Sequence, residues 1–399
     1  MRILIAAAGS RGDIAPYTGL GAGLREAGHD ITVATTDAFA SLVREAGLEF
    51  RSLPTRPGAQ RGVESRRELM RTAAAFVTEL GQGFADAVDD GTELLLLSAT
   101  TAQLGWHLAE SRGIRTLGVH LQPNAPTGDF PPTVMGPRSL GRLGNRAAGR
   151  LALRMADRVY AEAVTSLRHR LGLPPLTPSA MRRRQKRANR PVLHGFSTAL
   201  VPRPSDWREG LDVVGTWWPY VAPERRLPAE VEDFLAAGAR PVFIGFGSMA
   251  AGHGERLSGI AVEALRSAGL RGIVQSGGAG LAVDGDDVLT IGDVPHALLF
   301  PRTAAVVHHA GAGTAAAALR AGVPAVPVPV TADQPFWARR LAAIGAATDP
   351  IPFASLTAER LADALGRAVR QEAYARAASV AARHMATEDG VDAVLKALG

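Results

Sequence analysis

Short apolar runs alternate with longer segments of helical periodicity along the chain. In the first half, strands are predicted near 2–8, 30–35, 94–98 and 115–119, and in the second half near 241–246, 271–275, 288–291, 304–307 and 325–328. Helical patterns separate the runs, for example PYTGLGAGLREAG, which has Pro16 near its start and Gly28 at its end. This alternation predicts an α/β fold in which crossover helices join parallel strands.

The two halves of the chain open in a similar way. RILIAAAGS begins the first half and PVFIGFGS begins the second, and each is an apolar run that ends in Gly-Ser. Between them, residues 200–228 contain five prolines and no helical period, and the aromatic residues of TWWPY there are expected to pack. We therefore predict a Rossmann-like domain at 1–205, a linker at 206–228 and a second Rossmann-like domain at 229–399. The final alanine-rich helical stretch could cross back onto the first domain.

Composition narrows the class of protein. The 399 residues suffice for two domains, and 46% hydrophobic and 21% charged residues are typical of a soluble globular protein. The chain has no cysteine, which excludes disulfides and thiolate chemistry. No apolar run approaches the roughly 18 residues that span a bilayer. The N-terminal run soon turns polar and is interpreted as a strand rather than a signal peptide, so we expect a cytoplasmic protein without an integral membrane segment.

The formal net charge of +6 raises the question of a nucleic-acid partner. The densest basic run, RRRQKR at 182–187, has no interleaved aromatic residues on which bases could stack. A solvated loop is the better interpretation, and no nucleic-acid partner is expected.

The segment 306–341 is the strongest candidate for chemistry. A predicted strand ends in His308 and His309, and a turn of small residues leads into a helix at Thr314. Gly311 and Gly313 would let a ligand approach the backbone, and a helix N-terminus offers free N–H groups to an anion. His309 would add a hydrogen-bond donor to the same phosphate.

Two carboxylates accompany this phosphate-binding turn. The next predicted strand leads to Asp333 and Gln334, which are suited to sugar hydroxyls. Asp13 lies in GSRGDIAP, directly after the first strand of the chain. Ligands of open parallel sheets bind at the carboxyl ends of the strands, so the two halves should face each other across a cleft. Asp13 would lie at this cleft, and capping of the following helix is the alternative role for it.

Together these segments resemble the family-1-like glycosyltransferases of the GT-B fold, in their bacterial antibiotic and sterol branch. The resemblance rests on GSRGDIAPYTGLGAGLREAGHDITVAT, FIGFGSM, DVPHALLFPRTAAVVHHAGAGT and TADQPFW, and it covers essentially the whole chain. It implies Asp13 as general base in a loop shaped by Ser10 and Gly12. For the nucleotide-sugar donor it implies Ser248 beside the phosphates, Val294 at the nucleobase through its backbone, His309, Gly311, Gly313 and Thr314 at the pyrophosphate, and Asp333 and Gln334 at the sugar. The sequence departs from the pattern at Ala310, where related bacterial proteins usually have glycine.

The acceptor is expected at the long Pro- and Gly-rich segment 119–141. Its apolar side chains, Leu121, Phe130, Val134 and Met135, suit a lipophilic acceptor such as a polyketide, macrolide, flavonoid or sterol.

We therefore predict an inverting hexosyltransferase that moves a sugar from a UDP- or TDP-linked donor to a hydroxyl of a lipophilic small molecule. The nucleotide sugar is a co-substrate, and no cofactor is expected. No metal is expected either, because DGDD at 284–287 has the composition of a turn rather than of a metal-binding motif. Two alternatives stay open: a nucleotide-sugar epimerase of the same fold, and a catalytically silent auxiliary protein of a true transferase. The sequence does not predict the oligomeric state.

Overall fold

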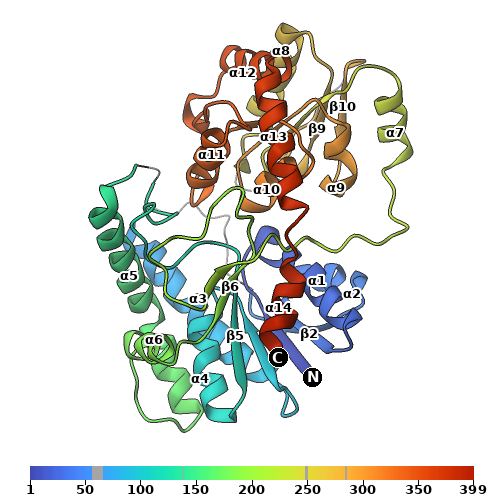
Figure 1. The fold of residues 1–399 in the computed structure, drawn as a ribbon. Coiled ribbons are helices and arrows are strands. Elements are labelled where there is room, and N and C mark those ends of the chain that lie inside the picture. The colour runs from blue at the N-terminus through green and yellow to red at the C-terminus, as the bar shows by residue number, and fades with distance from the viewer. Residues whose placement is uncertain (56–65, 137, 248–249, 284) are drawn as a thin grey trace.

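The computed structural model describes residues 1–55, 66–136, 138–247, 250–283 and 285–399. Within these ranges the N-terminal sheet has seven parallel strands: β1 (Arg2–Ala6), β2 (Asp30–Thr36), β3 (Glu49–Leu53), β4 (Leu94–Leu97), β5 (Arg115–His120), β6 (Val192–His194) and β7 (Leu211–Val213), in the order β3-β2-β1-β4-β5-β6-β7. Around it lie α1 (Arg11–Glu26), α2 (Ala40–Glu45), α3 (Arg66–Ala87), α4 (Ala102–Arg112), α5 (Gly141–Arg170) and α6 (Pro178–Arg187) (Figure 1).

The C-terminal sheet, in the same described ranges, has five parallel strands: β8 (Val242–Gly245), β9 (Gly272–Gln275), β10 (Val288–Ile291), β11 (Ala305–His308) and β12 (Ala325–Pro327), in the order β10-β9-β8-β11-β12. Its helices are α7 (Ala229–Ala236), α8 (Gly254–Ala268), α9 (His296–Leu299), α10 (Ala312–Arg320), α11 (Gln334–Ala343), α12 (Ala358–Arg370) and α13 (Glu372–Met385). The predicted α/β fold of two domains with parallel sheets is confirmed.

Each predicted apolar run contains a strand, because the central strands of a parallel sheet are buried on both faces. All four residues of β4, for example, are buried leucines. The strands that the sequence did not reveal lie toward the edges of the first sheet. β3 carries exposed polar residues, and β6 and β7 have three residues each. β7 falls inside the range expected for the linker, so the first sheet continues beyond residue 205.

The basic run at 182–187 is not a loop, and that expectation was wrong. It forms the second half of α6, which starts where the hydroxyl of Thr177 accepts a hydrogen bond from the backbone N–H of Ala180 at 3.2 Å. Two of its arginines meet acidic partners: Arg182 pairs with Asp157, and Arg184 lies 2.7 Å from Glu110.

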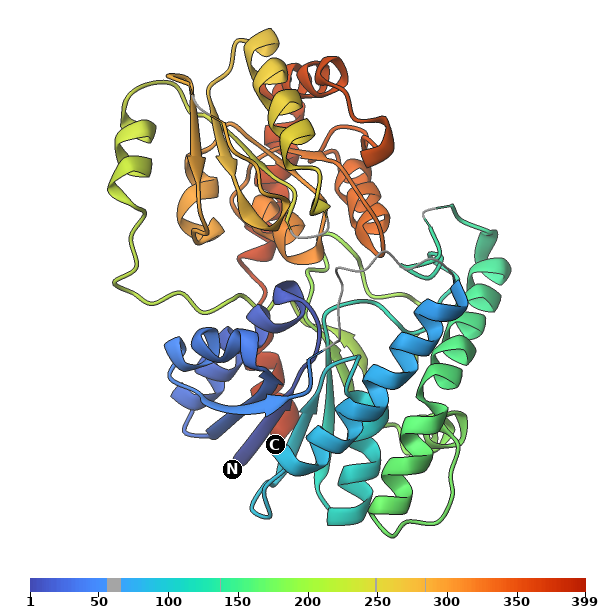
Figure 2. The same ribbon diagram turned by 180° about the vertical axis from the view of Figure 1, so that it is seen from behind.

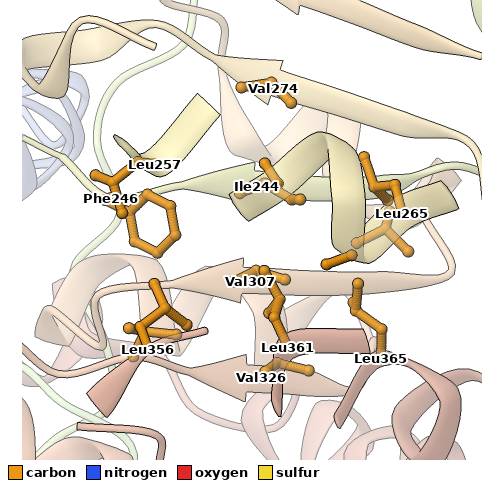
Figure 3. Packing of buried hydrophobic residues seen from close by; sticks show 14 of the residues in the cluster. Ile244, Phe246, Leu257, Leu265, Val274, Val307, Val326, Leu356, Leu361 and Leu365 are labelled. Atoms are coloured by element: carbon orange, nitrogen blue, oxygen red, sulfur yellow. The ribbon is translucent and has the colours of Figure 1, made fainter. Parts of the chain in front are cut away.

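The core of the C-terminal domain shows how the helices are fixed to the sheet. Figure 3 shows Ile244, Val307 and Val326 of neighbouring strands, which pack against the helices α8 and α12 that contact each other over this face of the sheet. Leucines of each helix point into this layer: Leu257 and Leu265, eight residues apart on α8, and Leu361 and Leu365, four residues apart on α12. These contacts hold the loops at the strand ends in place.

The last helix of the chain, α14 (Gly390–Leu398), lies on the N-terminal domain (Figures 1 and 2). Val394 and Leu398 are buried in the same apolar cluster as the residues of β1 and α1. The indole N–H of Trp217 donates a 2.9 Å hydrogen bond to the carbonyl of Gly390, at the start of this helix. The expected packing of the aromatic residues of TWWPY is confirmed for Trp217.

Candidate active site

Both sheets reverse their strand order, β1 next to β4 in the first and β8 next to β11 in the second. Loops that leave a parallel sheet at such a point form its usual ligand site. Two side-chain contacts join these regions. Arg11, after β1, pairs with Asp293, after β10, and Gln122, after β5, donates to Asp333, after β12. The carboxyl ends of both sheets therefore meet, and we call this region the domain interface.

Asp13 occupies the third position of α1 and forms a capping box with Ser10. Its Oδ2 accepts hydrogen bonds from the backbone N–H and from the hydroxyl of Ser10, each at 2.8 Å. Among the described residues none donates to Oδ1. Gly9 makes room for this arrangement, because a Cβ there would lie 2.5 Å from Oδ2 of Asp13. The capping alternative and a free carboxylate oxygen thus coexist in one side chain. Gly12, beside it, is exposed.

The turn after β11 begins with a fixed histidine. Nδ1 of the buried His308 accepts a 3.0 Å hydrogen bond from the backbone N–H of Ala310. Ala310 has φ 61°, in the left-handed region. Glycine adopts that conformation freely, whereas alanine loses roughly 1–2 kcal/mol. The alanine at position 310, where the sequence departs from the expected glycine, therefore costs backbone strain.

The ring of His309 lies between two glycines. A Cβ on Gly247 would stand 3.0 Å from its Cε1, and one on Gly311 would stand 2.6 Å from its Nε2. Burial lowers the pKa of His309 to about 4, so the imidazole is neutral near pH 7. Its Nδ1 is buried and has no hydrogen-bond partner among the described residues. A neutral imidazole with an uncommitted nitrogen suits a hydrogen bond to a ligand.

The N-terminus of α10 follows directly. Gly311 is its N-cap, and no side chain caps the helix. Gly313 is exposed, and a Cβ there would meet no atom within 4 Å. Thr314, at the third position, is half-buried. The first N–H groups of a helix have no partner inside it, so this open turn can bind an anion.

Asp333 and Gln334 stand side by side at the start of α11, but their side chains have different partners. Oδ2 of Asp333 accepts hydrogen bonds from the indole of Trp337 at 2.7 Å and from the amide of Gln122 at 3.0 Å. Burial raises the pKa of Asp333, and the negative charge of Asp13 adds to this effect. Gln334 is buried, and its Oε1 accepts from the backbone N–H groups at 330 and 331, so its oxygen shapes the preceding turn.

The loop after β10 carries the predicted nucleobase contact. The side chain of Val294 is buried in the core, while neither of its backbone groups bonds to another described residue. Next to it, the carboxylate of Asp293 forms an ion pair with Arg11 of the other domain. It also accepts a 3.1 Å hydrogen bond from the amide of Gln275.

The four acceptor candidates occupy different environments. Leu121 packs against the core of the first sheet. Phe130 is only 6% exposed, and its ring centroid lies 5.2 Å from that of Phe336 in the other domain. Val134 and Met135 are 64% and 49% exposed. Of the four, these last two offer the most open apolar surface.

Two predicted positions, Ser248 and Asp284 of the acidic turn, lie outside the described residues. In the part of the chain that the structure describes, no group of three or more His, Asp or Glu side chains could hold a metal ion. No helix in that part is both long and apolar enough to cross a membrane.

Comparison with known proteins decides the family. Residues 3–88 match the glycosyltransferase family 28 N-terminal domain, and residues 272–398 match the C-terminal domain of erythromycin biosynthesis protein CIII-like proteins. The O-mycaminosyltylonolide 6-deoxyallosyltransferase of Streptomyces fradiae is 38% identical over 98% of this chain and 95% of its own length. The chain belongs to the glycosyltransferase family of this deoxyallosyltransferase.

A second relative of this glycosyltransferase supports the family, and a solved structure supports the fold. The dTDP-epi-vancosaminyltransferase of Amycolatopsis orientalis is 33% identical over 95% of the chain and 93% of its own length. The crystal structure of the glycotransferase of kitacinnamycin superposes with a TM-score of 0.73, covering 100% of this chain and 97% of that one at 19% identity. The predicted GT-B fold and the resemblance to the antibiotic glycosyltransferase branch are confirmed.

Three residues of this glycosyltransferase that contact the candidate site were not predicted from the sequence: Gln122, Trp337 and Arg11. Gln122 lies inside the segment 119–141 that was expected to line the acceptor site, but no motif marks it. Trp337 follows Asp333 by one helical turn, and this spacing was the available signal.

Proposed function

We propose that this glycosyltransferase transfers a sugar, with inversion, from a TDP- or UDP-linked donor to a hydroxyl of a lipophilic small molecule. The observation that carries the proposal is the meeting of the carboxyl ends of both sheets at the domain interface, where the negative charge of Asp13 contributes to raising the pKa of Asp333. It brings the candidate base of one domain close to the candidate sugar-binding carboxylate of the other.

Asp13 is proposed as the general base. Its Oδ1 takes the proton of the acceptor hydroxyl while the hydroxyl oxygen forms a bond to the anomeric carbon. The bond from that carbon to the diphosphate oxygen breaks, and its electron pair leaves with the nucleoside diphosphate. Attack opposite the leaving group inverts the anomeric centre, so an α-linked donor gives a β-glycoside. A base positioned in this way typically contributes ~10²–10⁴-fold to the rate.

His309 and the N-terminus of α10 are proposed to stabilise the leaving diphosphate. The open N–H groups of the helix and its dipole favour negative charge, and the uncommitted imidazole adds one more hydrogen bond. Because these groups are fixed before the reaction, they can supply the stabilisation for which other transferases use a metal ion. The transfer is therefore proposed to be independent of metal.

The names of the relatives guide the choice of substrates. One relative is named for a dTDP-linked sugar, and the other acts on O-mycaminosyltylonolide. A TDP-linked deoxysugar and an acceptor that already carries a large apolar skeleton are accordingly the first candidates. The exposed Val134 and Met135 would contact such an acceptor.

Two other activities predict different behaviour. A nucleotide-sugar epimerase would act on the donor alone, and a silent auxiliary protein would have no need of a free carboxylate opposite a phosphate site. The presence of Asp13 and His309 with uncommitted atoms favours the transferase.

A thermal-shift panel of TDP-, UDP- and GDP-sugars tests the donor, since a ligand that binds the folded state raises its stability by mass action. The preferred donor is then incubated with a panel of macrolide, flavonoid and sterol acceptors, and glycosides are detected by mass spectrometry. Donor consumption that gives an isomeric nucleotide sugar without any acceptor would support the epimerase instead. Binding without turnover of any acceptor would support the auxiliary protein.

A further inference from the structure

The hydrogen bond between Gln122 and Asp333 is one of several ties between the two domains. Phe130 packs on Phe336, and Arg11 pairs with Asp293. Docking of the domains therefore does not depend on one amide, and the particular partner of Gln122 calls for another explanation.

Asp333 stands at the N-cap of α11 but does not cap it. An aspartate at this position usually accepts a hydrogen bond from a backbone N–H of the first turn, whereas here no such bond is formed. Its Oδ2 is taken by two side chains instead, the indole of Trp337 and the amide of Gln122. The residue before it, Ala332, has φ 57°, a strained conformation for alanine. Backbone strain of this kind is concentrated at functional sites.

Both donors bond to Oδ2 of the Asp333 carboxylate, and neither bonds to Oδ1. Among the described residues, no other residue donates to Oδ1 of Asp333. We infer that Gln122 is a positioning residue for Asp333: together with Trp337 it fixes the carboxylate so that Oδ1 accepts a hydrogen bond from a hydroxyl of the donor sugar. This inference rests on the proposed function. It makes recognition of the sugar, though not of the nucleotide, depend on a residue of the acceptor-side domain.

The charges around Asp333 add a second consequence. Burial, and to a smaller extent the negative charge of Asp13, raise its pKa, while hydrogen bonds from Trp337, from its own backbone N–H and from Gln122 lower it. Loss of the Gln122 amide would therefore raise the pKa of Asp333 further. As the pH falls, the carboxylate would then become protonated at a higher pH than in the unsubstituted protein. A residue that only filled space would not change this titration.

The test compares Gln122→Met, which keeps the length of the side chain but cannot donate, with Asn124→Ala in the same loop. Asn124 is exposed, and its backbone N–H, which bonds the carbonyl of Gln122 at 2.9 Å, survives the substitution. Calorimetric titrations use TDP-glucose, UDP-glucose, TDP and UDP. We expect Gln122→Met to weaken binding of the preferred nucleotide sugar at least tenfold and to leave the free nucleoside diphosphate within twofold. Asn124→Ala should change neither.

Two further readouts separate positioning from packing. The acid limb of the pH profile of donor KM should move to higher pH in Gln122→Met. In an Asp333→Asn background the same substitution should have no further effect, because the two residues act through one carboxylate. Equal weakening of nucleotide and nucleotide sugar, or no weakening of either, would overturn the inference. Failure of the unsubstituted protein to bind any of the four ligands would instead overturn the proposed function, and the inference with it.

Discussion

The ring of His309 lies so close to Gly311 that a Cβ on the glycine would stand 2.6 Å from its Nε2. Gly311 has ordinary backbone angles at the N-cap of α10, so glycine is required there for space and not for conformation. The histidine and the helix N-terminus are thus fitted to each other at the proposed phosphate site.

Gly311→Ala should therefore reproduce the loss of nucleotide affinity caused by His309→Ala. We expect each variant to lose roughly 1.5–3 kcal/mol of binding free energy for the nucleoside diphosphate, the value of a hydrogen bond to a charged group. Calorimetry measures this directly. Gly259→Ala on α8 is the control, since a methyl there enters open space. Unchanged affinity in His309→Ala would remove the histidine from the site.

Asp13→Asn should preserve folding and donor binding but lower kcat by ~10²-fold or more, because the amide cannot take the acceptor proton. The amide oxygen can still accept the hydrogen bonds from Ser10 that complete the capping box. Ser10→Ala is the matched comparison, since it removes one of these bonds and keeps the carboxylate. Turnover of Asp13→Asn within threefold of the unsubstituted enzyme would leave Asp13 with a capping role alone.

Some features of the candidate site could be predicted from the sequence, and others could not. The strands, the helix after His309 and the position of Asp13 follow from local patterns, because continuous apolar runs and Gly-rich turns have few other uses. Gln122 and Arg11 could not be found in this way, since their partners are more than 200 residues away and no periodicity links them. Phe130 was expected at the acceptor, but the structure buries it against Phe336, because apolar composition does not say which apolar surface a side chain will meet.

Stability should fall as the pH decreases below about 6.5. Burial lowers the pKa of His194 and His308 to about 3 and that of His120 and His309 to about 4. These rings stay neutral in the folded state, while the unfolded chain binds protons near pH 6.5, so unfolding takes up protons. Their full contribution is present above pH 6.5 and is lost progressively toward pH 4. Each such histidine contributes a slope of about 1.4 kcal/mol per pH unit within that window.

Urea denaturation at pH 7.5, 6.5, 6.0 and 5.5 measures this dependence. We expect a constant free energy of unfolding above pH 6.5 and a steep decrease below it. A flat profile down to pH 5.5 would show that the histidines are protonated in the folded protein.

Turnover should survive chelation. Since His309 and the N-terminus of α10 are proposed to stabilise the leaving diphosphate, EDTA treatment is expected to leave near-full activity, and added Mg²⁺ or Mn²⁺ should give little gain. An activity that EDTA abolishes and one of these ions restores would contradict the mechanism. It would direct attention to the acidic turn at 284–287.

The position of α14 bears on how the chain is made. Val394 and Leu398 complete an apolar cluster whose other members lie largely in the first 120 residues. During synthesis, the N-terminal sheet emerges from the ribosome long before the helix that covers it. Until Val394 and Leu398 arrive, this domain exposes part of its core, so it cannot be completed before residues 229–385 have also been synthesised. The two Rossmann-like units are thus distinct in the fold, but the first is completed by residues that follow the second in the chain.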